Sequence, residues 1–194
     1  MACKVPRVLV LGHSFVKRLA RDIDQGCDPR LEGSFGLQGS VAIRLAGVGG
    51  RNVNKLRSFD LGIVRSYAPD IVLLEIGTND LAQLSPEVVG SAADDLVRLL
   101  LEQFSVRVVG WCCVIPRGLS HTDALLFHRS AKILNNFVEV VLESVPKAFC
   151  WHHRIFNHPA KAFYLPDGVH LNAAGQYQLY RSYRGAILKA LSLM

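Results

Sequence analysis

Four short segments of the sequence carry groups suited to acyl transfer, and the first is Gly12-His13-Ser14. The segment follows an apolar run, so Ser14 is expected where a strand gives way to a helix. A serine exposed there could act as a nucleophile, and a helix N-terminus favours nearby negative charge. Serine is also a preferred helix N-cap, so this segment alone leaves both interpretations open. It matches neither GxGxxG nor a Walker loop.

Two further segments offer hydrogen-bond donors. Three glycines stand close together at Gly47, Gly49 and Gly50. They are typical of a flexible loop, or of backbone N–H groups that approach an oxyanion. Gly77-Thr78-Asn79-Asp80 follows the next buried strand, where such residues usually form a turn. In the functional interpretation the Asn79 amide donates into the same crevice, while Asp80 caps the segment that follows it.

The fourth segment places an acid near a base. Asp167 and His170 are three residues apart across a turn that contains Gly168. This spacing allows the carboxylate to accept a hydrogen bond from one ring nitrogen while the other nitrogen faces outward. A histidine oriented in this way could take the proton of a serine. The alternative, if the segment stood alone, is a solvent-exposed histidine in a turn.

The remaining histidines do not indicate a metal site. His152, His153 and His158 lie close together in sequence, but no acidic or cysteine residue stands at the spacing of a zincin or a zinc finger. We therefore expect surface histidines, no bound metal and no cofactor.

The hydrophobic pattern predicts the elements that position these groups. Strands are expected at 7–11, 41–45, 71–76, 106–115 and 148–154, the last at a sheet edge. Helices are expected at 14–24, 52–59, 86–104, 122–144 and 172–191. Strands that alternate with helices favour an α/β fold with a parallel sheet covered on both faces. Ligands in such folds lie outside the carboxyl ends of the strands. The first three segments follow strands, and the fourth, near the C-terminus, is expected to converge on the same crevice.

Two helices have apolar stripes that predict their inward faces. In the helix at 86–104 the stripe consists of Val89, Ala93, Leu96 and Leu100. In the helix at 122–144 it consists of Leu126, Ile133, Phe137 and Val141.

Composition indicates a globular chain. Its 194 residues suit one domain spanning 1–194, and half of them are hydrophobic. The net charge of +6 comes from scattered residues, which favours a solvated surface over attraction to nucleic acid or anionic lipid. The five cysteines form no CxxC motif, and no signal peptide or membrane span is evident. We therefore expect reduced thiols and an intracellular, cytoplasmic location.

The four segments, in this order, resemble the blocks of the SGNH hydrolases, also called the GDSL family. The matching residues are Gly12-His13-Ser14, Gly49-Gly50, Gly77-Thr78-Asn79-Asp80 and Asp167-Gly168-Val169-His170. The resemblance implies a flavodoxin-like three-layer α/β/α sandwich. It also implies hydrolysis of carboxylic esters, with small acyl esters such as acetates as the expected substrates.

The resemblance also implies a role for each residue. Ser14 is the nucleophile, His170 its base, and Asp167 orients His170. The backbone N–H groups of Ser14 and Gly50, together with the Asn79 amide, form the oxyanion hole.

One residue departs from the family pattern. The first block usually has aspartate before the serine, and this chain has His13. The hydrogen bonds around the nucleophile are therefore expected to differ. His13 is not expected to be the base, because a neighbour in sequence is poorly placed to reach the Ser14 hydroxyl.

A narrower resemblance concerns residues 8–16 and 73–81. They are similar to the esterase domain in the first-reading-frame protein of some LINE-type retrotransposons. This implies an excised domain whose partners include membranes or lipids, and whose parent protein associates with element RNA. Two alternatives to an active esterase stay open: a binding module without useful turnover, and a domain that interacts with nucleic acid. Acyltransferases and thioesterases share the architecture.

Overall fold

A computed structural model describes residues 5–156 and 161–194. Five parallel strands form one sheet in the order β2-β1-β3-β4-β5. They are β1 (Arg7–Gly12), β2 (Ala42–Gly47), β3 (Ile71–Glu75), β4 (Val108–Cys112) and β5 (Ala148–Trp151). The winding reverses at β1, which has β2 on one side and β3 on the other. This confirms the predicted flavodoxin-like sheet, and β5 lies at the predicted edge.

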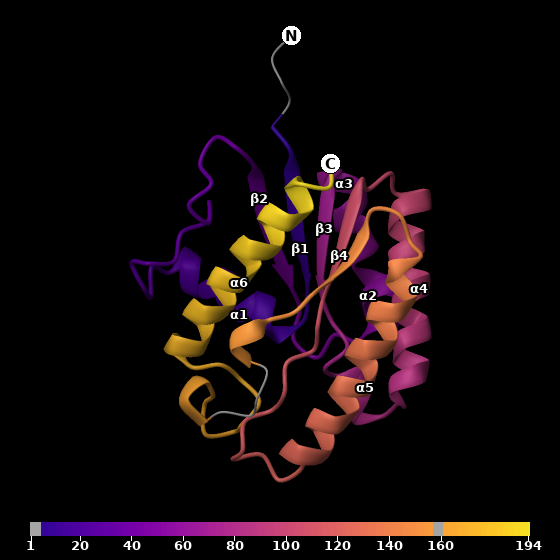
Figure 1. The fold of residues 1–194 in the computed structure, drawn as a ribbon. Helices are drawn as coiled ribbons and strands as arrows, with labels where there is room; N and C mark the ends of the chain where they lie inside the picture. Colours follow the sequence, from indigo (N-terminus) through magenta and orange to yellow (C-terminus); the bar gives the residue numbers. More distant parts are fainter. Residues whose placement is uncertain (1–4, 157–160) are drawn as a thin grey trace.

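Helices cover both faces of the sheet (Figure 1). The helices are α1 (Ser14–Asp24), α2 (Val53–Phe59), α3 (Leu61–Tyr67), α4 (Pro86–Gln103), α5 (Ala124–Glu143) and α6 (Ala173–Leu191). Short 3-10 turns are η1 (Asp80–Ala82), η2 (Arg154–Phe156) and η3 (Lys161–Phe163). Helices α1 and α6 lie on one face, and α2, α4 and α5 lie on the other. No helix among the described residues is long and apolar enough to cross a membrane.

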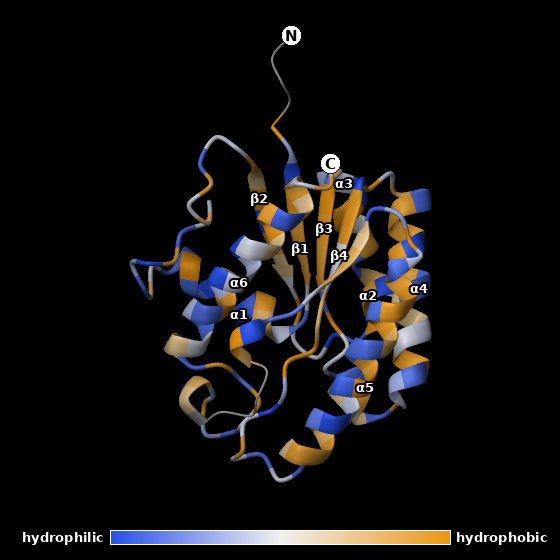
Figure 2. Cartoon of the chain, in the orientation of Figure 1, coloured by the Kyte–Doolittle hydropathy of each residue, from blue (hydrophilic) through white to orange (hydrophobic). Residues whose placement is uncertain are grey.

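Alternation along the strands divides the core into two layers. In β1, Val8 and Val10 pack toward α1 and α6, whereas Leu9 and Leu11 pack toward the helices of the opposite face. The central strands are apolar on both sides (Figure 2), as expected for a parallel sheet buried between helices. This burial fixes the register and holds the carboxyl ends of β1, β2 and β3 beside one another.

The predicted inward face of α4 is confirmed, but the one predicted for α5 is right only for Phe137, which packs against the core. Val89, Ala93, Leu96 and Leu100 of α4 are fully buried. In α5, Leu126 and Ile133 are exposed, and the buried stripe is Phe127, Ala131, Leu134, Val138 and Leu142. The buried stripe repeats every three or four residues without a gap, whereas the predicted stripe is interrupted between its first two members.

Strand β4 is shorter than the prediction of 106–115. Cys113 N still donates to Trp151 O of β5 at 2.9 Å. At the next residue the Asn135 side chain of α5 makes the hydrogen bonds that a neighbouring strand would make. Its Oδ1 accepts from Val114 N at 2.8 Å, and its Nδ2 donates to Val114 O at 2.9 Å. Helix α3 was not expected, and it ends at Ala68 in a left-handed conformation with φ of 46°.

Candidate active site

Ser14 is the first residue of α1, directly beyond the end of β1. The capping side chain is that of His13, whose Nδ1 accepts from Phe15 N at 3.4 Å. The Ser14 hydroxyl is therefore not the cap of α1, and the N-cap interpretation of this serine does not hold. The turn is tight: a Cβ at Gly12 would lie 2.1 Å from Glu75 O, so only glycine fits there.

The glycine loop after β2 is a tight turn beside Ser14. Arg51 N donates to Val48 O at 3.4 Å, and Gly50 has a φ of +71°. This positive φ at the third position of the turn favours glycine. A Cβ built at Gly49 or Gly50 meets no atom within 4 Å, so the backbone here borders open space.

Asn79 and Asp80 follow β3 and serve different purposes. Asn79 Nδ2 donates to Arg51 O at 2.7 Å, which leaves its second N–H available. The expectation that Asp80 caps the segment after it is wrong. Its carboxylate instead accepts from Val53 N at 3.0 Å and so caps α2, far away in sequence. Burial raises the pKa of Asp80, and the bond from Val53 N opposes that rise.

The structure brings Asp167 and His170 together as the spacing suggests. Asp167 Oδ2 lies 2.7 Å from His170 Nδ1, and Oδ1 accepts from the backbone N–H of Val169 and of His170, each at 2.9 Å. Partial burial acts to raise the pKa of Asp167, but these hydrogen bonds hold it at about 2. Gly168 has a φ of +66°, which allows the turn to close. The carboxylate therefore fixes the ring and leaves His170 Nε2 for other partners.

Four of the five predicted site residues line one pocket of about 460 Å³. They are Ser14, Gly50, Asn79 and His170, and Asp167 stands behind His170. The hydrogen bonds of the described residues include none between Ser14 and His170, a contact that is often long in the absence of substrate.

The charged side chains that line this pocket are basic. Lys17, Arg18 and Arg21 reach it from α1, and no carboxylate lines it among the described residues. Arg21 pairs with Asp22 at 2.7 Å, whereas the described ion pairs include neither Lys17 nor Arg18. The pocket therefore presents positive charge to whatever enters it.

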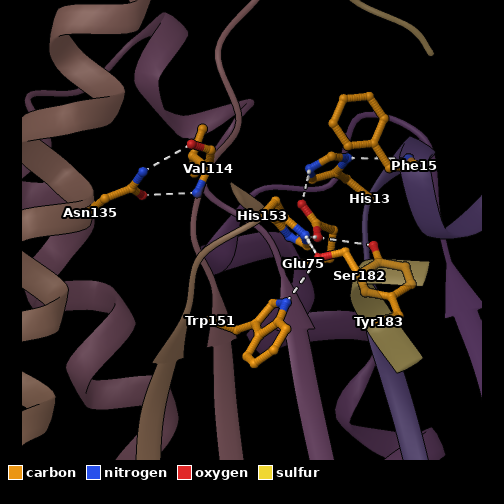
Figure 3. A network of polar contacts seen from close by, with 9 residues as sticks. All are labelled: His13, Phe15, Glu75, Val114, Asn135, Trp151, His153, Ser182 and Tyr183. Carbon is orange, nitrogen blue, oxygen red and sulfur yellow. Dashed lines mark hydrogen bonds and ion pairs between the residues drawn. The ribbon is translucent and has the colours of Figure 1, made fainter. Parts of the chain in front are cut away.

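A buried polar network surrounds Glu75 and reaches His13, the residue before Ser14 (Figure 3). Glu75, the last residue of β3, is 1% exposed, and its Oε2 accepts from Tyr183 Oη at 2.9 Å. His153 Nε2 lies 3.1 Å from the same oxygen. The expectation that His153 is a surface residue is therefore wrong: η2 and α6 enclose it, and Ser182 Oγ lies 2.8 Å from its Nδ1. His152 is exposed, as expected, and His158 lies outside the described residues.

One group of potential metal ligands exists among the described residues, and it belongs to this network. The ligand atoms of Glu75, Cys112 and His153 lie within 4.8 Å of one another. Burial raises the pKa of the Cys112 thiol well above its ordinary value, so the sulfur is held as a thiol. Tyr183 and His153 are both within hydrogen-bond distance of Glu75 Oε2, so this oxygen already has two partners.

Sequence reasoning missed Glu75, although a signal for it exists. A glutamate stands inside the apolar run from Ile71 to Ile76, and a charge in a fully buried strand requires partners. Tyr183 and His153 could not be identified as those partners, because they lie far away in sequence and only the fold brings them to β3.

Comparison with known proteins agrees with the fold. Residues 10–178 match the model of the GDSL-like Lipase/Acylhydrolase family. The fold resembles a GDSL-like lipase from Bacteroides thetaiotaomicron, with a TM-score of 0.71 and 19% identity over 98% of this chain and 93% of that one. It also resembles a catalytic mutant of an acetylxylan esterase from Geobacillus stearothermophilus, with a TM-score of 0.69 and 16% identity over 96% of both chains. No curated protein gave a significant match.

Proposed function

Because the chain belongs to the GDSL-like lipase/acylhydrolase family, we propose that it is a serine esterase that hydrolyses carboxylic esters. One observation carries the proposal. A single pocket is lined by Ser14, Gly50, Asn79 and His170. The Asp167 carboxylate binds Nδ1 of His170, which leaves Nε2 to act as the base.

In the first step Ser14 Oγ attacks the ester carbonyl carbon while His170 Nε2 takes the hydroxyl proton. Asp167 accepts the Nδ1–H bond, which keeps the lone pair on Nε2. With a pKa of about 2 this carboxylate is ionised at neutral pH and stabilises the imidazolium that forms. His170 then protonates the leaving alcohol, and a water molecule activated by the same nitrogen hydrolyses the acyl-enzyme.

The negative charge on the carbonyl oxygen needs donors in place before it develops. The backbone N–H groups of Ser14 and Gly50 and the second N–H of Asn79 are suited to this role. Helix α1 adds the positive end of its dipole at Ser14. Each such donor contributes about 3 kcal/mol of barrier lowering in comparable sites.

We further propose that the preferred substrate is a short acyl ester that carries negative charge. The short acyl group is suggested by the modest pocket and by one structural neighbour that is named as an acetylxylan esterase. The negative charge is suggested by the lining, where Lys17 and Arg18 stand without a carboxylate opposite them.

Hydrolysis of nitrophenyl esters with two to twelve acyl carbons tests the function. Wild type is compared with Ser14→Ala. Turnover that vanishes in the variant supports the esterase and gives its chain-length preference. If neither folded protein hydrolyses any ester, the assignment of the nucleophile fails.

A second candidate is a binding module within a larger retroelement protein, in contact with lipid or RNA. Its support is the basic face around the pocket and the histidine that replaces the aspartate before Ser14. RNA affinity that falls steeply with salt would favour this function, and no binding at low salt would reject contact with RNA.

A further inference from the structure

The network behind Ser14 connects a buried carboxylate to the residue that precedes the nucleophile. Glu75 touches this residue twice. Its backbone carbonyl accepts from His13 N at 3.1 Å, and its Oε1 lies 3.8 Å from His13 Nε2. Both side chains are 1% exposed, so their interaction is screened by protein and not by water (Figure 3).

The proton positions on His153 follow from the bonds around it. Trp151 Nε1 can only donate, so Ser182 Oγ accepts this bond at 2.9 Å, and the hydroxyl proton of Ser182 is left to donate to His153 Nδ1. The Glu75 carboxylate can only accept, so His153 Nε2 carries a proton. Trp151 thus donates to Ser182, Ser182 donates to His153, and His153 donates to the Glu75 carboxylate.

The tautomer of His13 follows in the same way. Its Nδ1 accepts the Phe15 N–H that begins α1, so a neutral ring must carry its proton on Nε2. Burial lowers the pKa of His13, with Glu75 opposing that effect, so the ring is neutral at neutral pH. His13 Nε2 has no hydrogen-bond partner among the described residues and lies 3.8 Å from Glu75 Oε1. The negative charge of this carboxylate therefore favours a proton on Nε2.

We propose that Glu75 is a positioning residue for the nucleophile. Its carboxylate holds His13 in the tautomer protonated on Nε2, which leaves Nδ1 to cap α1 and fixes the first turn that presents Ser14. Hydrogen bonds with Tyr183 and His153 hold the carboxylate in place, and the Cys112 sulfur lies within 4.8 Å of it.

The same arrangement keeps positive charge away from the reaction. His13 and His170 are close enough for their charges to interact. A protonated His13 would repel the imidazolium that His170 becomes during attack. The neutral ring is therefore the form of His13 that is compatible with turnover. Burial keeps the ring neutral, and Glu75 determines which nitrogen of that neutral ring carries the proton.

Glu75→Gln is the informative variant because it keeps the shape of the side chain and replaces one acceptor oxygen with an N–H₂ donor. If the amide oxygen of the glutamine accepts from Tyr183 and His153, its N–H₂ group faces His13 Nε2. His13 Nε2 must then be unprotonated to accept a hydrogen bond from it. His13 would then carry its proton on Nδ1 and lose the cap to Phe15. We expect kcat to fall at least about 10-fold with KM changed less than about twofold, since substrate contacts remain.

A double-variant cycle with His13→Asn separates positioning from general stability. Asparagine caps a helix through its own oxygen and does not depend on Glu75. Adding Glu75→Gln to His13→Asn should therefore lower kcat by less than about twofold. Glu139→Gln, an exposed carboxylate paired with His152 at 3.1 Å, is the matched control and should not change kcat. Full additivity in the cycle would overturn the inference.

The inference rests on the proposed function for its kinetic readout, so a second measurement is independent of activity. Long-range ¹H–¹⁵N NMR of histidine-labelled protein reports the tautomer of each ring, and His13→Asn assigns the His13 signals. The wild type should show protonated Nε2, and Glu75→Gln should lose that pattern while Glu139→Gln keeps it. If the wild type hydrolyses no ester, the proposed function fails and NMR still decides this inference. An unchanged His13 tautomer in folded Glu75→Gln overturns it.

Discussion

Asp167 binds His170 through both of its carboxylate oxygens, and each oxygen has a separate task. Oδ2 lies 2.7 Å from the ring Nδ1, whereas Oδ1 accepts the backbone N–H groups of Val169 and His170. One carboxylate therefore shapes the turn and orients the ring at the same time. Substitutions at this position test the two tasks independently.

Alanine substitutions in the triad should rank in a defined order. Ser14→Ala and His170→Ala are expected to lower kcat at least about 10³-fold, because no other group replaces the nucleophile or base. Asp167→Ala should be milder, at about 10- to 100-fold, because water or backbone can partly orient the ring. Steady-state hydrolysis of nitrophenyl acetate measures all three, with circular dichroism as the control for folding. An equal loss in all three would contradict the ranking.

Asp167→Asn should be at least as damaging as Asp167→Ala. The two backbone N–H groups keep the asparagine oxygen at the Oδ1 position, so the amide N–H₂ faces His170 Nδ1. His170 would then carry its proton on Nε2 and could not take one from Ser14. The measurement is kcat for both variants at pH 7.5. A markedly more active Asp167→Asn would show that the ring is not held in this tautomer.

Removal of the basic side chains at the pocket should weaken binding of anionic esters selectively. In Lys17→Gln/Arg18→Gln, KM for mono-nitrophenyl succinate should rise about 5- to 10-fold, while KM for nitrophenyl butyrate changes less than twofold. The two esters share the leaving group and acyl length, so the difference reports charge alone. Added salt should reproduce the effect in wild type.

The control for this prediction is Lys55→Gln/Arg57→Gln on α2, which removes the same charges outside the pocket lining. It should leave both KM values unchanged. If it raises KM for the succinate ester as strongly, the preference comes from net charge and not from Lys17 and Arg18.

The sequence was sufficient for the sheet, because each strand is an apolar run that ends in turn residues. It also located Ser14 and Asn79, since the carboxyl ends of parallel strands meet at one edge, and it located His170 through its spacing from Asp167. It failed for α5, where apolar residues occupy several faces and only packing against α4 selects one. A Cβ at Gly90 of α4 would lie 2.3 Å from the Phe137 ring, which shows how closely these helices approach.

The partners of the site required the fold. Asp80 caps a helix that precedes it by 27 residues, and His153 meets Glu75 across 78 residues. Hydrogen bonds between residues so far apart leave no periodic pattern in the sequence. From sequence spacing alone, such residues are therefore interpreted as turn or surface groups.

His13 should make stability depend on pH. Burial lowers the pKa of His13 from its ordinary value of 6.5, so the unfolded chain binds this proton first as pH falls. The free energy of unfolding should therefore be constant above about pH 7.5 and should decrease as pH falls through 6.5. Urea unfolding of wild type and His13→Asn at pH 8 and pH 5.5 measures this. The variant keeps a helix cap and should lose less stability; an equal loss would mean that other groups carry the dependence.

The close approach of β1 to β3 leaves no room for a side chain at Gly12, two residues before Ser14. In Gly12→Ala the new Cβ would lie 2.1 Å from Glu75 O, the carbonyl that accepts from His13 N, so two strand ends must separate. We expect a loss of about 3 kcal/mol and a Tm lower by about 6–12 °C. Gly49→Ala is the matched control, because its Cβ meets no atom within 4 Å, and its Tm should change by less than about 2 °C. Thermal unfolding of wild type, Gly12→Ala and Gly49→Ala measures these Tm values. An unchanged Tm in Gly12→Ala would show that the strand ends are free to separate.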